Sequence, residues 1–251
     1  MKLAVAGKGG VGKTTLAAAL ARGLAAAGQK VLAVDADPNN CLGAALGFPA
    51  DSLAALTPIS QMRDLLTERA GTSDGGGFFA LNPPVTDLLP RFSLTQDGIS
   101  LLVMGTVERP GGGCVCPESA VLRALTRHLV GLDDTALVMD LEAGLEHLGR
   151  GTAQYMDRLL IVTEPTPASV RTTRRIAELA TGLGLRCAAV GNNIRDDAAA
   201  EFVRAGVAPI PIAGLLPYDP VIEQAYRGPT QPSSAFSAAI AKLLSVLEGS
   251  S

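Results

Sequence analysis

Residues 7–14 read Gly7-Lys8-Gly9-Gly10-Val11-Gly12-Lys13-Thr14, a full match to the phosphate-binding pattern G-x-x-x-x-G-K-[ST]. An apolar run that predicts a strand, Lys2–Ala6, precedes the motif, and an Ala/Leu-rich run that predicts a helix, Thr14–Ala27, follows it. Because the motif requires this strand–loop–helix context, an ordinary glycine-rich turn is a weak alternative. In such a loop, backbone N–H groups and the helix N-terminus hold phosphate oxygens, Lys13 reaches the β- and γ-phosphates, and Thr14 ligates Mg²⁺.

Apolar runs without alternation recur along the chain and predict strands that are covered on both faces. These runs are Lys2–Ala6, Lys30–Asp35, Ile99–Met104, Ala136–Leu141, Arg158–Thr163, Leu185–Gly191 and Pro209–Leu215. Helical patterns lie between them, the clearest at Thr14–Ala27, Pro117–Val130, Ala168–Leu183 and Ser234–Leu247. This alternation predicts an α/β fold, a doubly wound and mostly parallel sheet with helices on both faces. We expect one P-loop ATPase domain over residues 1–251, with a loop or insertion at about 71–98, where glycines and prolines interrupt any periodicity.

The composition of the chain excludes several classes of function. With 47% apolar and 18% charged residues, the chain has ample core for a globular protein, which excludes disorder. A net charge of -3 and 4% aromatic residues, with no Trp, provide neither a basic field nor a stacking surface for nucleic acid. Charge-free stretches are too short to span a membrane, and no signal peptide opens the sequence. We therefore expect a cytoplasmic protein with no nucleic-acid or membrane partner.

Acidic residues follow two further predicted strands. Asp35 and Asp37 come at the end of the second strand, and Asp140 lies in the run Ala136–Leu141. Carboxylates at the C-terminal edge of a parallel sheet face the ligand crevice. Asp140 is placed to hold Mg²⁺ through water, and the backbone N–H of Gly144 can reach a γ-phosphate. Either cluster alone is more typical of a solvated strand end, but together with the phosphate loop they predict a site for ATP or ADP with Mg²⁺. The loop contacts expected for this nucleotide are Gly9, Gly10, Val11, Gly12, Lys13, Thr14 and Thr15.

The sequence resembles the deviant Walker A ATPases, the group that includes MinD, ParA, the nitrogenase iron protein and the arsenical-pump ATPases. KGGVGKTT at 8–15, DADP at 35–38 and D-x-x-A-G at 140–144 carry the resemblance. It implies a Mg-dependent ATPase that converts ATP and water to ADP and phosphate. The catalytic residues implied are Lys8, which crosses a homodimer interface to the partner's nucleotide, Lys13, and Asp37, which orients the attacking water. A lysine supplied in trans would tie hydrolysis to dimer closure.

The same resemblance implies the contacts of the base. An asparagine after a late strand, Asn192 in this sequence, reads adenine. The segment formed by Pro217, Tyr218 and Asp219 flanks the base. These roles come from the resemblance alone.

Cys114-Val115-Cys116-Pro117 follows three glycines and directly precedes a predicted helix. Thiols at a helix N-terminus have lowered pKa values, which favours the thiolate that binds a soft metal. A C-x-C supplies two ligands, whereas zinc or square-planar nickel takes four, so two copies meeting across a dimer axis would complete a site. Structural and redox interpretations of Cys114 and Cys116 remain open. Cys41 and Cys187 are expected to be buried in the core.

A narrower resemblance is to the CooC family, ATPases that assist nickel insertion into carbon monoxide dehydrogenase. It rests on AVAGKGGVGKTT at 4–15, AVDADPNNCLG at 33–43, GCVCPESAVLRAL at 113–125 and MDLEAGLEHLGRGTA at 139–153. It implies a metal-binding homodimer, with Ni²⁺ or Zn²⁺ held at the interface by Cys114 and Cys116, and carbon monoxide dehydrogenase as client. The alternatives are a MinD/ParA-type positioning ATPase and an iron–sulfur carrier or reductase of the nitrogenase iron protein type. The pattern assigns no role to Glu142 or His147 and does not say which metal is physiological.

Overall fold

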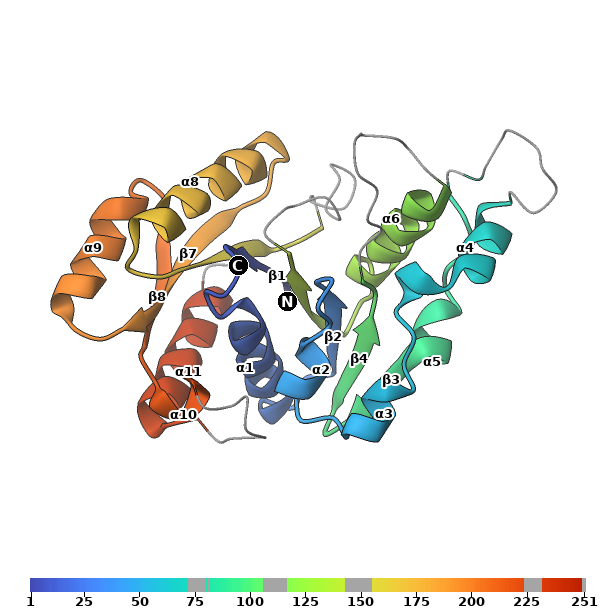
Figure 1. Ribbon diagram of the computed structural model, residues 1–251, viewed down its shortest axis with the longest axis horizontal. Helices are drawn as coiled ribbons and strands as arrows, with labels where there is room; N and C mark the ends of the chain where they lie inside the picture. The colour runs from blue at the N-terminus through green and yellow to red at the C-terminus, as the bar shows by residue number, and fades with distance from the viewer. Residues whose placement is uncertain (72–79, 81, 106–116, 143–154, 224–231, 250–251) are drawn as a thin grey trace.

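The computed structural model describes residues 1–71, 80, 82–105, 117–142, 155–223 and 232–249. Its centre is an eight-stranded sheet in the order β3-β4-β2-β5-β1-β6-β7-β8 (Figure 1). The strands are β1 Lys2–Gly7, β2 Val31–Ala36, β3 Ser93–Gln96, β4 Ile99–Val103, β5 Ala136–Leu141, β6 Arg158–Thr163, β7 Cys187–Ile194 and β8 Ile212–Pro217. Every neighbouring pair is parallel except β3 and β4. The prediction of a doubly wound, mostly parallel α/β sheet is confirmed.

Helices cover both faces of the sheet, as its apolar strands require. The longer helices are α1 Lys13–Ala26, α4 Arg63–Ala70, α6 Pro117–Val130, α8 Pro167–Gly182, α9 Asp197–Val207 and α11 Ser234–Glu248. The short ones are α2 Leu42–Ala45, α3 Ala50–Ala54, the 3-10 turn η1 Ile59–Gln61, α5 Leu88–Phe92 and α10 Pro220–Glu223. One apolar core lies between the sheet and α1 and α11, another lies between the sheet and α4, α6 and α8, and a smaller cluster joins α8 and α9 to β7. Within the described ranges, no helix has the length and apolar character needed to cross a membrane.

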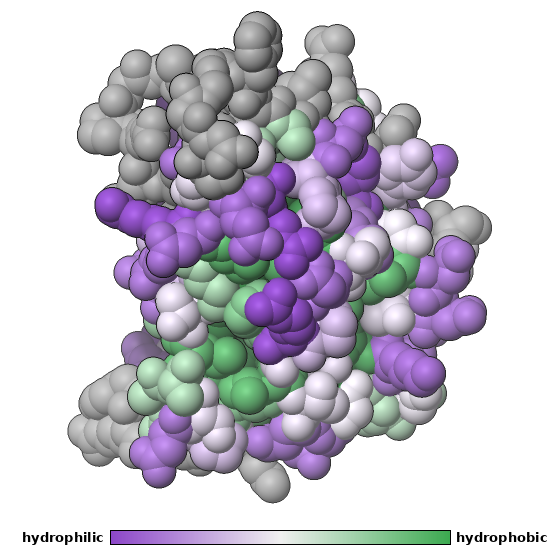
Figure 2. Space-filling model, turned by 90° about the vertical axis from the view of Figure 1, so that its right-hand side faces the viewer, coloured by the Kyte–Doolittle hydropathy of each residue, from purple (hydrophilic) through white to green (hydrophobic). Residues whose placement is uncertain are grey.

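The segment 71–98 contains more regular structure than the sequence predicted. Its second half forms α5 and then β3, which pairs antiparallel with β4. The turn between β3 and β4 consists of Asp97 at φ 50° and Gly98 at φ 78°, the left-handed backbone of a tight hairpin. β3 is the edge strand of the sheet. Figure 2 looks onto this side of the molecule, where apolar surface gathers in the lower half beside hydrophilic residues.

Candidate nucleotide-binding site

The phosphate loop joins β1 to α1 at the C-terminal edge of the sheet, and its glycines are required by close packing. Gly7 has φ 152°, and a Cβ there would lie 2.6 Å from the carbonyl oxygen of Val162. Gly12 has φ 93°, and a Cβ there would lie 2.4 Å from Nδ2 of Asn192. No side chain fits either position without moving its neighbours. The loop therefore presents backbone, with Lys8, Gly9 and Gly10 exposed.

Lys13 begins α1 and points back into the site rather than into solvent. Its residue is only 7% exposed, and Nζ lies 3.8 Å from Oδ2 of Asp37. The other oxygen of that carboxylate, Oδ1, accepts from the backbone N–H of Asn39 at 2.9 Å and from its side-chain amide at 2.8 Å. Asn39 thus fixes the Asp37 carboxylate and leaves Oδ2 toward the lysine. The two residues that sequence reasoning assigned to catalysis within one chain lie side by side.

Asp35 supports this arrangement from inside the sheet. It is fully buried, and its two oxygens accept from the backbone N–H of Asp37 at 3.2 Å and of Leu42 at 2.8 Å. Burial raises the pKa of Asp35 to about 6, and the two N–H donors offset part of that effect. Asp35 therefore positions the turn that carries Asp37 and the start of α2.

Asp140 has no such support. It lies opposite Asp35 in the β2–β5 register and is fully buried, yet neither carboxylate oxygen has a hydrogen-bond partner among the described residues. Burial raises its pKa to about 7, although the nearby Thr14 hydroxyl and Lys13 act in the opposite direction. Mg²⁺ is bound through one or two carboxylate or hydroxyl oxygens together with phosphate and water. Two unpartnered oxygens beside Thr14 fit that requirement.

Asn192 lies inside β7 and contacts the back of the phosphate loop. It is 8% exposed, and its Nδ2 donates to the carbonyl oxygen of Val11 at 2.8 Å. The next residue, Asn193, takes φ 58° and donates its side-chain amide to Glu164. In the structure the Asn192 amide thus holds the loop against β7, a contact that the sequence pattern did not indicate. Its expected role in reading adenine stays a prediction.

The segment predicted to flank the base follows β8. Asp219 is 4% exposed, and its oxygens accept from the backbone N–H of Val221 at 2.9 Å and of Ser233 at 2.7 Å. It therefore ties the start of α10 to the start of α11. The ring of Tyr218 lies under the guanidinium of Arg195, 3.5 Å from the ring centroid. The sequence did not predict the contact of Arg195 with Tyr218, because no local pattern indicates a stacking partner at the end of another strand.

The proposed metal ligands Cys114 and Cys116 lie outside the described residues, as do Gly144 and His147. Among the residues that the structure describes, no group of three or more His, Cys, Asp or Glu side chains is arranged to hold a metal ion. Glu142 is described and exposed, directly after β5.

The prediction that Cys41 is buried was wrong. Cys41 is exposed at the N-terminus of α2, because the turn after β2 carries it out of the core. Partial burial, and then the neighbouring carboxylates beginning with Asp35, raise the pKa of its thiol. Cys187 is half-buried at the start of β7 and packs at the margin of one core.

Comparison with known proteins agrees with this geometry. Residues 2–229 match the CobQ/CobB/MinD/ParA nucleotide binding domain family. The chain is 43% identical over 227 residues to the carbon monoxide dehydrogenase accessory protein CooC of Rhodospirillum rubrum, covering 90% of this chain and 86% of that protein. It is 40% identical over 235 residues to an uncharacterised ATP-binding protein of Methanocaldococcus jannaschii, covering 91% and 90% of the two chains. The structure of MinD in the Aquifex aeolicus MinC:MinD complex superposes with a TM-score of 0.67 at 22% identity, covering 99% of this chain and 96% of that one. At that identity the likeness concerns the fold.

Proposed function

The chain belongs to the CobQ/CobB/MinD/ParA nucleotide-binding family, and from this premise we propose that it is a Mg-dependent ATPase accessory to carbon monoxide dehydrogenase. In this role it couples ATP hydrolysis to the insertion of nickel into that enzyme. The observation that carries the ATPase assignment is the buried, unpartnered carboxylate of Asp140 beside Thr14 and Lys13. The client assignment rests on the similarity to the carbon monoxide dehydrogenase accessory protein of Rhodospirillum rubrum.

The chain's own groups divide the work at the phosphates. Backbone N–H groups of the loop bind phosphate oxygens, and the Lys13 ammonium neutralises their charge. Thr14 and Asp140 hold Mg²⁺, which when bound screens the phosphate charge and fixes the triphosphate geometry. Asp37, fixed by Asn39, lies 3.8 Å from Lys13 and positions the attacking water. Phosphoryl transfer depends mainly on such positioning and charge neutralisation.

The remaining positive charge at the phosphates comes from a second copy of the chain. Lys8 is exposed on the loop, so its side chain is free to reach the nucleotide of a facing protomer. The active unit is then a homodimer of one ATPase domain, residues 1–251, that closes when both copies hold ATP. Closure brings the Cys114 and Cys116 pairs together into a four-thiolate site for nickel or zinc, and hydrolysis reopens it.

The test combines nucleotide state with metal content. Elemental analysis and native mass are measured on the protein without nucleotide, with ADP and with a nonhydrolysable ATP analogue. We expect one chelator-resistant nickel or zinc ion per dimer, lost in the double variant Cys114→Ser/Cys116→Ser, and dimers that Lys8→Ala weakens in the ATP-analogue state. If the double variant binds metal as tightly as the parent, the interface site is wrong. If the protein does not hydrolyse ATP with Mg²⁺, the enzyme assignment is wrong.

A further inference from the structure

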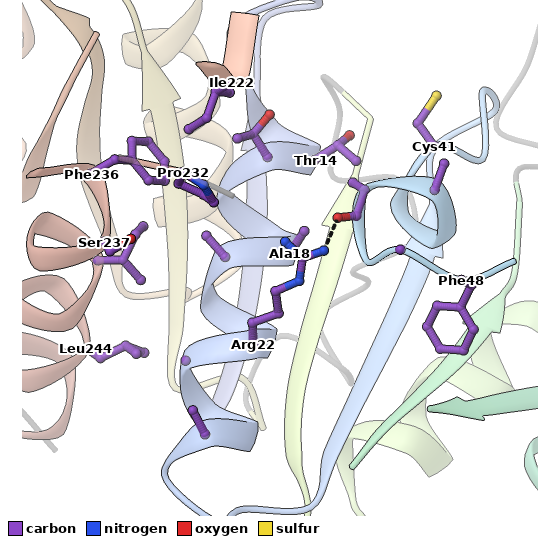
Figure 3. Close-up of a pocket in the computed structure, with 18 of the residues that line it drawn as sticks. Thr14, Ala18, Arg22, Cys41, Phe48, Ile222, Pro232, Phe236, Ser237 and Leu244 are labelled. Atoms are coloured by element: carbon purple, nitrogen blue, oxygen red, sulfur yellow. Dashed lines mark hydrogen bonds between the residues drawn. The ribbon is translucent and has the colours of Figure 1, made fainter. Parts of the chain in front are cut away.

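A groove of about 1190 Å³ runs along the outer side of α1, beginning at the nucleotide site (Figure 3). α1 forms its floor, α11 forms one wall, and α2 with the residues leading into α3 forms the other. The walls are apolar, with Phe236 and Leu244 on the α11 side and Phe48 on the opposite side. Thr14 and Thr15 line the end of the groove that meets the phosphate loop.

The floor is one face of a helix. Thr15, Ala19, Arg22 and Ala26 follow one another at intervals of four, three and four residues along α1, and all of them line the groove. Residues at this spacing lie on the same side of an α-helix. Two of them are alanines, so another backbone can approach closely. α1 has 14 residues and is therefore about 21 Å long, room for a partner helix of about four turns.

Among the described residues that line this groove, Arg22 is the only one with a charged side chain. Its Nη2 donates to the carbonyl oxygen of Ala45 at 2.9 Å, which holds the guanidinium across the groove halfway along the floor (Figure 3). In the part of the chain that the structure describes, no carboxylate lies within ion-pair distance of Arg22. A guanidinium carries five N–H donors, and carboxylate is the acceptor that matches its geometry. A lone arginine among apolar walls therefore favours an apolar occupant that carries one acid.

We propose that this groove binds an amphipathic helix of the client protein, with its apolar face between α11 and α2 and an Asp or Glu side chain on Arg22. Helix-in-groove recognition uses apolar anchors at helical spacing, which the length and walls of this groove fit. The proposal rests on the proposed function, because it takes the client to be carbon monoxide dehydrogenase. Since Thr14 and Thr15 belong to both the groove and the nucleotide site, the docked helix contacts the turn of α1 that binds nucleotide.

The test measures the Kd of the full-length protein for purified nickel-free carbon monoxide dehydrogenase by biolayer interferometry. Arg22→Glu reverses the central charge, and Ala26→Trp fills the exposed far end of the floor. The matched control is Arg186→Glu, which reverses an exposed arginine just before β7, outside the groove. We expect both groove variants to weaken the Kd at least tenfold, the control to stay within twofold, and ATP hydrolysis without client to be unchanged in all three.

The outcomes separate this inference from the proposed function. If the client binds the parent and both groove variants equally, the docking site is wrong while the accessory role stands. If the client does not bind the parent in any nucleotide state, the client assignment itself is wrong and the docking site falls with it. If Arg22→Glu instead abolishes self-association measured by native mass, the groove receives a second copy of this chain and the proposal is overturned.

Discussion

Replacing Asp140 with Asn is expected to stabilise the nucleotide-free protein while impairing its ATPase activity. Asp140 is fully buried with no hydrogen-bond partner among the described residues, and burial raises its pKa from 3.8 to about 7. An acid whose pKa is higher in the folded state binds more protons there than in the unfolded chain. The free energy of unfolding therefore falls as the pH rises from about 4 to about 7, and it stays low above that range.

The size of the effect follows from the pKa values. A rise from 3.8 to about 7 corresponds to about 4 kcal/mol of free energy of unfolding at pH 8. Asparagine removes this charge cost but brings an amide that needs hydrogen-bond partners, which costs about 1–3 kcal/mol. We expect a net gain of about 1–3 kcal/mol for Asp140→Asn at pH 8. Asp35, with a pKa raised to about 6, lies opposite Asp140 and its charge adds to the rise in the Asp140 pKa, so the substitution also removes the repulsion between these two carboxylates.

Urea unfolding at pH 5 and pH 8, without nucleotide or Mg²⁺, provides the measurement. The stability difference between variant and parent should be largest at pH 8 and shrink at pH 5, where the Asp140 carboxyl is protonated in the folded parent. Asp134→Asn is the matched control, because Asp134 is exposed just before the same strand at φ 52°, a backbone that Asn tolerates. In the same preparations, Mg-dependent ATPase activity should fall at least a hundredfold in Asp140→Asn only. The argument from burial would be refuted if Asp140→Asn were no more stable than the parent at pH 8. It would also be refuted if the stability difference between the two proteins were the same at pH 5 and pH 8.

Three further substitutions test the frame around the site. Gly12→Ala should lower the free energy of unfolding by more than about 2 kcal/mol in thermal denaturation, because the residue has φ 93° and its new Cβ would lie 2.4 Å from Asn192; a fully stable variant would contradict the loop geometry. Asn192→Ala removes the 2.8 Å bond to Val11 and should lower stability by about 1 kcal/mol and weaken ADP binding in calorimetry; unchanged affinity would show that the loop needs no such brace. Asp219→Ala leaves the N–H groups of Val221 and Ser233 without their acceptor and should cost about 1–3 kcal/mol in urea unfolding, whereas Asp219→Asn should retain part of it.

The sequence predicted best the features that depend on neighbouring residues and the strands that are buried on both faces. The strands at Ala136–Leu141 and Arg158–Thr163 were placed to the residue, because strands buried on both faces are continuous apolar runs. The strand–loop–helix arrangement around residues 7–14 was also predicted, since glycines at fixed offsets have one backbone role. β3 was missed because an edge strand of four half-exposed residues carries neither alternation nor an apolar run. Its partner β4 could be recognised only because that strand is buried.

Contacts between distant strand ends could not be predicted. Arg195 and Tyr218 are neighbours because β7 and β8 end side by side, and nothing in either local sequence encodes the pair. The same holds for the Asn192 amide on the Val11 carbonyl, which joins residues far apart in the chain. Exposure of Cys41 was mispredicted for a related reason. Leu42 and Leu46, which follow Cys41, are buried, but the turn that precedes them points the thiol outward.

The ion pair between Lys13 and Asp37 connects these observations to the proposed reaction. The two side chains are 8% and 12% exposed, so both charges are largely removed from water, and Asp37 is compensated by Asn39 as well as by the ion pair. Phosphate oxygens compete for the same ammonium, and a charge-assisted contact with phosphate is stronger than a 3.8 Å approach to a carboxylate. Binding of a triphosphate would therefore draw Lys13 away and leave Oδ2 of Asp37 free to accept from water, while Asn39 keeps Oδ1 in place. In this scheme the site acquires its water-positioning group only once phosphate is bound, which suits the proposed coupling of hydrolysis to dimer closure.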